Sequence, residues 1–198
     1  MMRDQSMARR LGAGLSALIL SAVPCWTGAR ADTIEEKATV CSACHGEKGV
    51  PTEKEIPTIW GQQEGYIYLQ LRDYKKGARK NEIMEQIAAT LERDDMKELA
   101  AYFAAKPWTN LAQPTAADVD VRDAKTANSS IGCSACHLDQ FQGTGSVPRL
   151  SGQSQAYLAK TLNDFRSGAR ANNPGMTSLA QASSERDLAA MESYLAGL

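Results

Sequence analysis

The chain has 198 residues, of which 43% are hydrophobic, and its 22 Lys and Arg residues nearly balance its 23 Asp and Glu residues. A net charge of −1 without a basic cluster argues against nucleic-acid binding. The length allows two small domains but not two large apolar cores, so each domain needs another source of buried apolar surface.

The first 31 residues are predicted to be an export leader. Basic residues precede an apolar run over residues 11–23, and residues 29–31 read Ala-Arg-Ala, a small-x-small cleavage site. The run is too short to span a bilayer with ease, which favours cleavage before Asp32. An uncleaved leader that holds the protein loosely at the membrane is the alternative. Of the five cysteines, Cys25 would be discarded with this segment.

Two pentapeptides with the sequence Cys-Ser-Ala-Cys-His, at residues 41–45 and 133–137, predict two covalent c-type haems. Cysteines three residues apart on a helix share a face, so both thiols can add to the vinyl groups of one haem. His45 and His137 follow directly and are placed to bind iron. A four-cysteine zinc site is the alternative, but it explains neither histidine. The attachment residues are Cys41, Cys44, Cys133 and Cys136.

The chain contains an internal repeat that extends beyond these pentapeptides. Residues 57–79 and 148–170 share nine identical residues at a constant offset of 91, and the offset becomes 92 after one residue is inserted in the loop 171–175. The connection between the repeats lacks apolar periodicity and is predicted to be extended. The predicted parts of the chain are residues 1–31 (leader), 32–110 (first domain), 111–123 (linker) and 124–198 (second domain).

The pattern within each repeat is helical, and no convincing strand pattern is present, so the fold class expected is all-α. Apolar and aromatic residues recur at helical spacing, and glycines follow the middle helix of each repeat. Each haem is expected to serve as the largest apolar element of its domain, so the chain without haem should be largely unfolded. The expected helices are residues 32–43, 63–76, 93–105, 124–135, 154–167 and 184–196.

The sixth iron ligand is expected to be methionine. Both histidines of the chain are in the pentapeptides, which leaves methionine, lysine, an amine terminus or water. Met96 and Met191 lie opposite leucines in the repeat and are expected to be core residues. Met84 and Met176 lie opposite each other, each 39 residues after its histidine, and are predicted to be the distal ligands. A six-coordinate iron has no open position, which argues against enzymatic chemistry.

Two further motifs recur in both halves, Gly-Gln-x-x-x-Tyr at residues 61–66 and 152–157 and Gly-Ala-Arg at residues 77–79 and 168–170. Together with the haem pentapeptides and the methionines, they resemble the dihaem cytochrome c4 family over essentially the whole chain after the leader. The resemblance implies a periplasmic electron-transfer protein. It also implies two class I cytochrome c domains related by pseudo-twofold symmetry, each wrapped around one covalent haem, with the haem edges close to the domain interface.

Several supporting residues are expected around the haems. The resemblance implies that the carbonyls of Pro57 and Pro148 accept hydrogen bonds from Nδ1 of the two histidines and so orient the imidazoles, with a turn-forming role as the alternative. Two recurring tyrosines and two recurring arginines are expected to reach the haem propionates or to bridge the domain interface, with helix packing as the alternative. These four residues are Tyr66, Tyr157, Arg79 and Arg170.

Two functions remain open for a chain of this kind. The first is a freestanding electron carrier between redox proteins such as a quinol-oxidising complex and a terminal oxidase. The second is a dihaem electron-accepting subunit of a periplasmic dehydrogenase, such as a sulfide-oxidising flavocytochrome. The first is favoured because the repeats fill the chain. Residues 32–110 sum to −3 and residues 124–198 to +1, so the two haems are expected to have unequal potentials.

Overall fold

The structure is a computed structural model that describes Met1 and residues 33–198. The predicted leader therefore lies almost entirely outside the described residues. Residues 32–198 form one compact unit. Among the described residues, no helix has both the length and the apolar character needed to cross a membrane.

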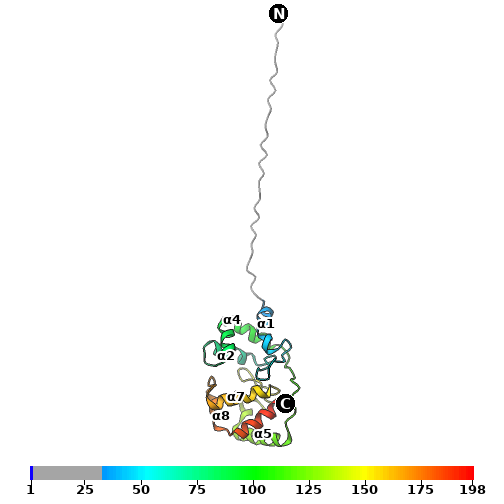
Figure 1. Cartoon of the computed structure of the whole chain (residues 1–198), viewed down its shortest axis with the longest axis vertical. Coiled ribbons are helices and arrows are strands. Elements are labelled where there is room, and N and C mark those ends of the chain that lie inside the picture. Colours follow the sequence, from blue (N-terminus) through cyan, green and yellow to red (C-terminus); the bar gives the residue numbers. More distant parts are fainter. Residues whose placement is uncertain (2–32) are drawn as a thin grey trace. The chain divides into compact units, whose positions relative to one another are not determined.

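The first repeat is built from four described helices (Figure 1). The first helix begins at a capping box, in which the Thr33 hydroxyl accepts from Glu36 N and the Glu36 carboxylate accepts from Thr33 N. The last helix packs on the first two and buries Met96, Leu99 and Phe103. These helices are α1 (Ile34–His45), α2 (Glu64–Lys75), α3 (Glu82–Ala89) and α4 (Arg93–Ala104).

The second repeat has the same order of helices, except that the helix leading to its haem motif is divided in two. Gly132 adopts φ +82° and divides the segment before the second histidine into two helices. The first of them packs against the last helix of the chain around Phe141, Met191 and Leu195. The helices are α5 (Asp118–Ile131), α6 (Cys133–His137), α7 (Gln155–Ser167), α8 (Pro174–Ala182) and α9 (Glu185–Ala196).

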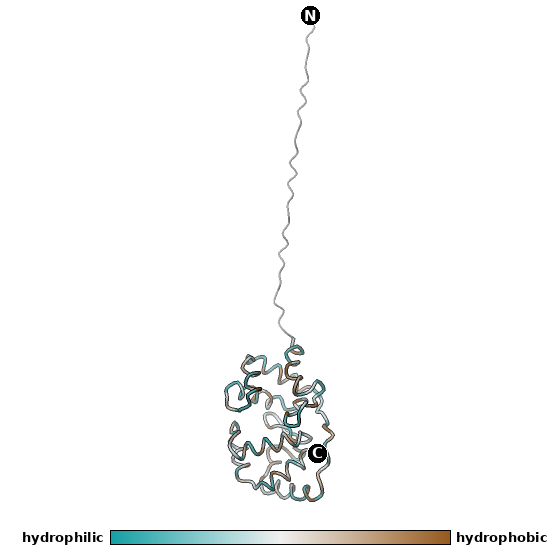
Figure 2. The backbone as a smooth tube through the Cα atoms, viewed as in Figure 1, coloured by the Kyte–Doolittle hydropathy of each residue, from teal (hydrophilic) through white to brown (hydrophobic). Residues whose placement is uncertain are grey.

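The all-α expectation is correct for the described residues, where the only β interaction is an isolated bridge between Thr144 and Val147. Hydrophilic and hydrophobic residues alternate along the helices in Figure 2, as expected for helices with one buried face. The two methionines expected in the cores are there: Met96 is 4% exposed and Met191 is 2% exposed.

The structure differs from the expected elements in several places, one of which is the break at Gly132 within the expected helix 124–135. The segment 111–123 was expected to be extended, but α5 begins at Asp118. This earlier start is supported by Asp118 and Asp120 in the first turn, where carboxylates favour the helix N-terminus, and by Ala124 and Ala127, which pack in the core. The short helices α3 and α8 were not predicted at all.

Candidate haem sites

The first haem motif occupies the last turn of α1. Cys41 and Cys44 are half-buried, and His45, which ends the helix, is 9% exposed. Both thiols are free of disulfides. Burial raises the pKa of the Cys41 thiol to about 11. One continuous helix therefore holds two unpaired thiols and a buried imidazole within five residues.

The second haem motif forms a separate helix, α6, after Gly132. Cys133 is half-buried, Cys136 is exposed and His137 is buried. The Asn128 side chain stabilises the break, because its oxygen accepts from Ser134 N at 3.0 Å and its nitrogen donates to Ser134 Oγ at 3.1 Å. The second site thus reaches the same arrangement as the first through a different local backbone.

Each histidine is oriented by a proline carbonyl. His45 Nδ1 lies 2.7 Å from Pro57 O, and His137 Nδ1 lies 2.9 Å from Pro148 O, which are the contacts expected from the resemblance. A carbonyl oxygen can only accept, so Nδ1 carries the proton and Nε2 keeps a lone pair for a metal. Burial lowers the pKa of both imidazoles, and the proline carbonyls oppose this only in part. Both rings are therefore neutral, as iron ligation requires.

Met84 and Met176 occupy equivalent positions in α3 and α8. Each is the third residue of its helix, and each backbone N–H donates at 3.0 Å to the side chain of the N-cap asparagine, Asn81 or Asn173. Both methionines are half-buried, and Met84 packs against the core of the first repeat. The asparagine caps are the sequence signal that identifies these helices: Asn81 and Asn173 recur at an offset of 92, and Pro174 occupies the first turn of α8.

The donor set of these sites fits covalently bound haem. Two pairs of unpaired thiols each precede a neutral imidazole whose Nε2 makes no hydrogen bond within the described chain. The competing zinc site does not assemble, since no group of three or more His, Cys, Asp or Glu side chains among the described residues can hold a metal ion. The arrangement provides two separate one-haem sites.

The four recurring tyrosines and arginines bridge the two repeats in a crossed pattern. Arg79 of the first repeat donates to the hydroxyl of Tyr157 at 3.0 Å, and Arg170 of the second donates to the hydroxyl of Tyr66 at 3.2 Å. Both guanidinium groups also donate to Gln70 Oε1, at 3.0 and 2.9 Å. These hydrogen bonds bridge the two repeats, which is one of the two roles expected for these residues.

This cluster carries positive charge without an anionic partner. Neither Arg79 nor Arg170 forms an ion pair with a carboxylate of the described residues, and Arg170 is 6% exposed. Burial pushes the pKa of Tyr157 up, but the two guanidinium groups outweigh burial and lower it below its ordinary value. Buried cations are normally paired, so the cluster is suited to an anion such as a haem propionate.

Two glutamines of the Gly-Gln-x-x-x-Tyr motifs, for which the sequence indicated no role, also lie between the repeats. Gln62 is 4% exposed and Gln153 is 2% exposed, and each side chain forms two hydrogen bonds to a backbone residue of the other repeat. The only sequence signal for them is their recurrence at an offset of 91.

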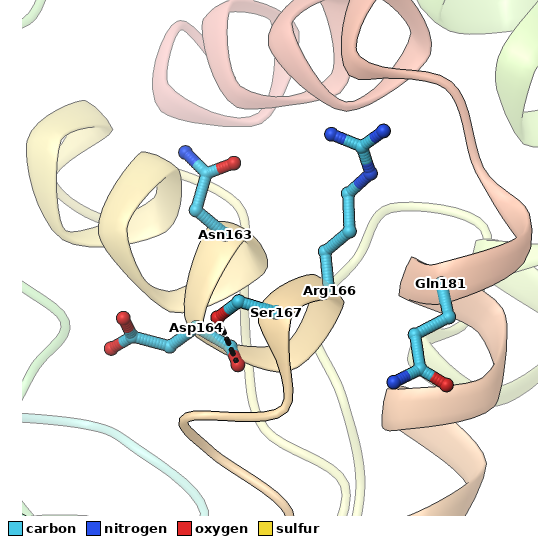
Figure 3. Close-up of a pocket in the computed structure, with 5 residues that line it drawn as sticks. All are labelled: Asn163, Asp164, Arg166, Ser167 and Gln181. Carbon is cyan, nitrogen blue, oxygen red and sulfur yellow. Dashed lines mark hydrogen bonds between the residues drawn. The ribbon is translucent and has the colours of Figure 1, made fainter.

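One pocket of the second repeat lies away from the residues of the haem sites. It measures about 480 Å³ and is lined by α7 and α8, with the Ser167 hydroxyl donating to the Asp164 carbonyl at 3.2 Å (Figure 3). Polar side chains surround it, and no cysteine, histidine or methionine lines it. This pocket has no part in the haem sites. Its lining residues are Asn163, Asp164, Arg166, Ser167 and Gln181.

Comparisons with known proteins agree with this geometry. No protein-family model matches the chain. Cytochrome c4 of Azotobacter vinelandii is 38% identical over 180 residues, covering 82% of this chain and 86% of the relative. The thiosulfate dehydrogenase electron acceptor of Stutzerimonas stutzeri is 35% identical and covers 81% and 80%. The crystal structure of reduced recombinant cytochrome c4 from Pseudomonas stutzeri superposes with a TM-score of 0.74 at 31% identity, over 83% of this chain and 96% of that one.

The fold and the two sites define a dihaem c-type cytochrome with two class I cytochrome c domains. Its cytochrome c4 relatives are electron carriers and not enzymes. The chain belongs to the cytochrome c4 family and carries two covalently bound haem c groups.

Proposed function

We propose that the protein carries single electrons in the periplasm through two irons that each have one histidine and one methionine ligand. The ligand assignment rests on one observation, that the same arrangement of histidine and methionine occurs in both repeats. In both halves a buried neutral imidazole offers Nε2, and a methionine follows 39 residues later at the third position of an asparagine-capped helix. The ligands are His45 and Met84 in the first repeat and His137 and Met176 in the second.

The residues of each site have separate tasks in this proposal. Bound haem supplies a one-electron ferric/ferrous couple. Cys41 and Cys44 in one repeat, and Cys133 and Cys136 in the other, hold it through two thioethers. The proline carbonyls keep the proton on Nδ1 and so fix the tautomer that leaves Nε2 free. The thioethers of Met84 and Met176 would favour the ferrous state and would keep water, oxygen and substrates from binding the iron.

Arg79 and Arg170 are proposed to face haem propionates between the repeats. Support comes from the lack of a carboxylate partner for either guanidinium and from the tyrosine hydroxyls that hold them in place. Charge-assisted hydrogen bonds to propionates would neutralise this buried positive charge. The same contacts would keep the two haems near a shared interface, which suits electron exchange between them.

The proposed partners are redox proteins, with a quinol-oxidising complex as donor and a terminal oxidase as acceptor. The proposed route to the periplasm is the leader over residues 1–31, cleaved before Asp32. The proposed domains are residues 32–110 and 124–198, and the connection 111–123 between them includes the start of α5 at Asp118.

A second candidate function is electron acceptance from a periplasmic dehydrogenase. It is favoured by the 35% identity to a protein named as the electron acceptor of a thiosulfate dehydrogenase. This observation points to a partner enzyme that oxidises an inorganic sulfur compound. Thiosulfate belongs to the same class of substrate as the sulfide that a flavocytochrome oxidises. Rapid reduction of the purified ferric protein by a thiosulfate dehydrogenase, with slow reduction by a quinol-oxidising complex, would select this candidate over the first.

The ligand assignment is tested by the optical spectrum of the ferric holoprotein. Two His/Met irons give the weak long-wavelength sulfur-to-iron charge-transfer band at full strength for two haems, with haem counted as the pyridine haemochrome. Met84→Ala and Met176→Ala should each remove half of the band. A wild-type spectrum without the band, or with a high-spin component, would refute methionine ligation.

A further inference from the structure

Two buried glutamines connect each repeat to the backbone of the other repeat in a reciprocal way. Gln153 Oε1 accepts from Thr58 N at 3.0 Å, and Gln153 Nε2 donates to Thr58 O at 3.0 Å. Gln62 Oε1 accepts from Arg149 N at 2.7 Å, and Gln62 Nε2 donates to Arg149 O at 3.0 Å. Each carboxamide therefore pairs with one residue of the opposite repeat, as a strand residue pairs with its neighbour.

The residues that these glutamines hold come directly after the two prolines of the haem sites. The Pro57 carbonyl and the Thr58 N–H belong to one planar peptide group. His45 Nδ1–H donates to that carbonyl, while the N–H donates to Gln153. In the other half, the peptide between Pro148 and Arg149 accepts from His137 and donates to Gln62. A single peptide group thus separates each histidine from a glutamine of the other repeat.

We propose that Gln62 and Gln153 are positioning residues that tune the haem of the opposite repeat: Gln153 acts on the haem ligated by His45, and Gln62 on the haem ligated by His137. The inference rests on the proposed histidine ligation, but not on the methionines. The effect is crossed, because each glutamine acts through the other repeat's proline and not through its own.

The sign of the effect follows from the polarisation of the peptide group. Hydrogen bonds in a chain strengthen one another, so an acceptor on the N–H makes the carbonyl of the same peptide a stronger acceptor. A stronger acceptor draws the Nδ1 proton and makes the imidazole a more electron-rich ligand. Electron donation stabilises ferric iron, so each glutamine lowers the reduction potential of the opposite haem.

The neighbouring Gln63 provides a matched control in the same repeat. Its Nε2 donates across the same interface to the Gln142 carbonyl at 3.0 Å, but it contacts neither proline peptide. Gln63→Leu therefore removes one hydrogen bond between the repeats without touching the path to a histidine. A purely structural role for the interface glutamines predicts similar results for Gln62→Leu and Gln63→Leu.

The test is a redox titration of the holoprotein followed by NMR, with the two sets of haem signals assigned from nuclear Overhauser contacts to the attachment cysteines and the histidine of each repeat. Gln62→Leu should raise the reduction potential of the haem on Cys133 and Cys136. The equilibrium constant for its reduction should rise by about twofold to threefold. That change is about 18–28 mV, since a tenfold change corresponds to 59 mV for one electron. The reduction potential of the other haem should shift by less than about a third of that amount.

The complementary variants complete the design. Gln153→Leu should give the reverse pattern, with the larger shift at the haem on Cys41 and Cys44, and Gln63→Leu should leave both potentials unchanged. If a leucine variant does not incorporate two haems, Gln62→Asn replaces it, because its carboxamide is one methylene too short to keep both bonds. The same crossed shift is then required.

Several results would overturn the inference. These are a shift in the haem of the glutamine's own repeat, equal shifts in both haems, a shift of similar size in Gln63→Leu, or no shift. The charge-transfer band of the parent protein separates this outcome from a failure of the proposed function. A full band without the crossed shift refutes only the inference. A missing band refutes methionine ligation, and the crossed shift then still decides the role of the glutamines.

Discussion

Gln70 is the residue whose replacement should most weaken the contact between the repeats. Its Oε1 atom accepts from Arg79 Nη1 at 3.0 Å, Arg170 Nη2 at 2.9 Å and Asn172 Nδ2 at 3.1 Å. Gln70→Met keeps the length of the side chain but removes this acceptor. Two of the lost hydrogen bonds are charge-assisted, at about 1.5–3 kcal/mol each, and one is neutral, at about 1 kcal/mol.

The expected net loss is smaller than the sum of these bonds. The hydroxyls of Tyr66 and Tyr157 remain as acceptors for the same guanidinium groups, and water can enter the loosened cluster. We therefore expect Gln70→Met to lower the free energy of unfolding by about 2–4 kcal/mol. The loss should fall on the contact between the repeats and not on either helical core.

Guanidinium-chloride unfolding of the holoprotein measures this loss, with far-UV circular dichroism and haem absorbance recorded on the same samples. Thr161 provides the control, because it is the counterpart of Gln70 at the offset of 91 and its side chain forms no hydrogen bond with either arginine. Thr161→Val should change the free energy of unfolding by less than about 1 kcal/mol. A Gln70→Met protein as stable as wild type would show that the arginine cluster does not hold the repeats together.

Three further changes test the cores, a buried carboxyl and a helix cap. Phe103→Ala, at a side chain 1% exposed, should cost about 3–5 kcal/mol in chemical unfolding, and a cost below 1 kcal/mol would contradict the assigned core. Burial raises the pKa of the half-buried Glu192 from 4.5 to about 7, so the contribution of this carboxyl to stability should be full below pH 4.5 and should fall as the pH rises from 4.5 to about 7. Glu192→Gln should remove that part of the fall, and unfolding curves for both proteins at pH 5 and pH 8 check it; an equal fall in both would refute a buried carboxyl. Asn173→Ala should cost about 1 kcal/mol by uncapping α8 and should weaken the charge-transfer band assigned to Met176, which an unchanged spectrum would contradict.

The sequence predicted the features that depend on short spacing. Two thiols and an imidazole within five residues share one helical turn, so the attachment motifs were recognisable without a structure. Helical periodicity likewise predicted α2, α4, α7 and α9 to within about two residues, since each buries one regular apolar face. The internal repeat separated the core methionines, Met96 and Met191, from the two candidate ligands.

The prediction from sequence missed the short or weakly apolar helices. Helices α3 and α8 have eight and nine residues and depend on an asparagine cap and on tertiary packing more than on propensity. The segment from Asp118 was predicted to be part of an extended linker because residues 111–123 lack apolar periodicity. The helix that begins there is held by two alanines further along it, Ala124 and Ala127, which are buried where α5 packs against α9.

The contacts between the repeats were decided by tertiary structure alone. Gln62 meets Arg149 across 87 residues, and Gln153 meets Thr58 across 95. Recurrence in both halves marked the glutamines, tyrosines and arginines as important without indicating which half each would contact. Their crossed pairing arises because two similar domains pack face to face. Arg79 of the first repeat therefore contacts Tyr157 of the second, and its counterpart Arg170 contacts Tyr66 of the first. A local pattern cannot encode that choice, since it depends on which surfaces are buried together when the whole chain folds.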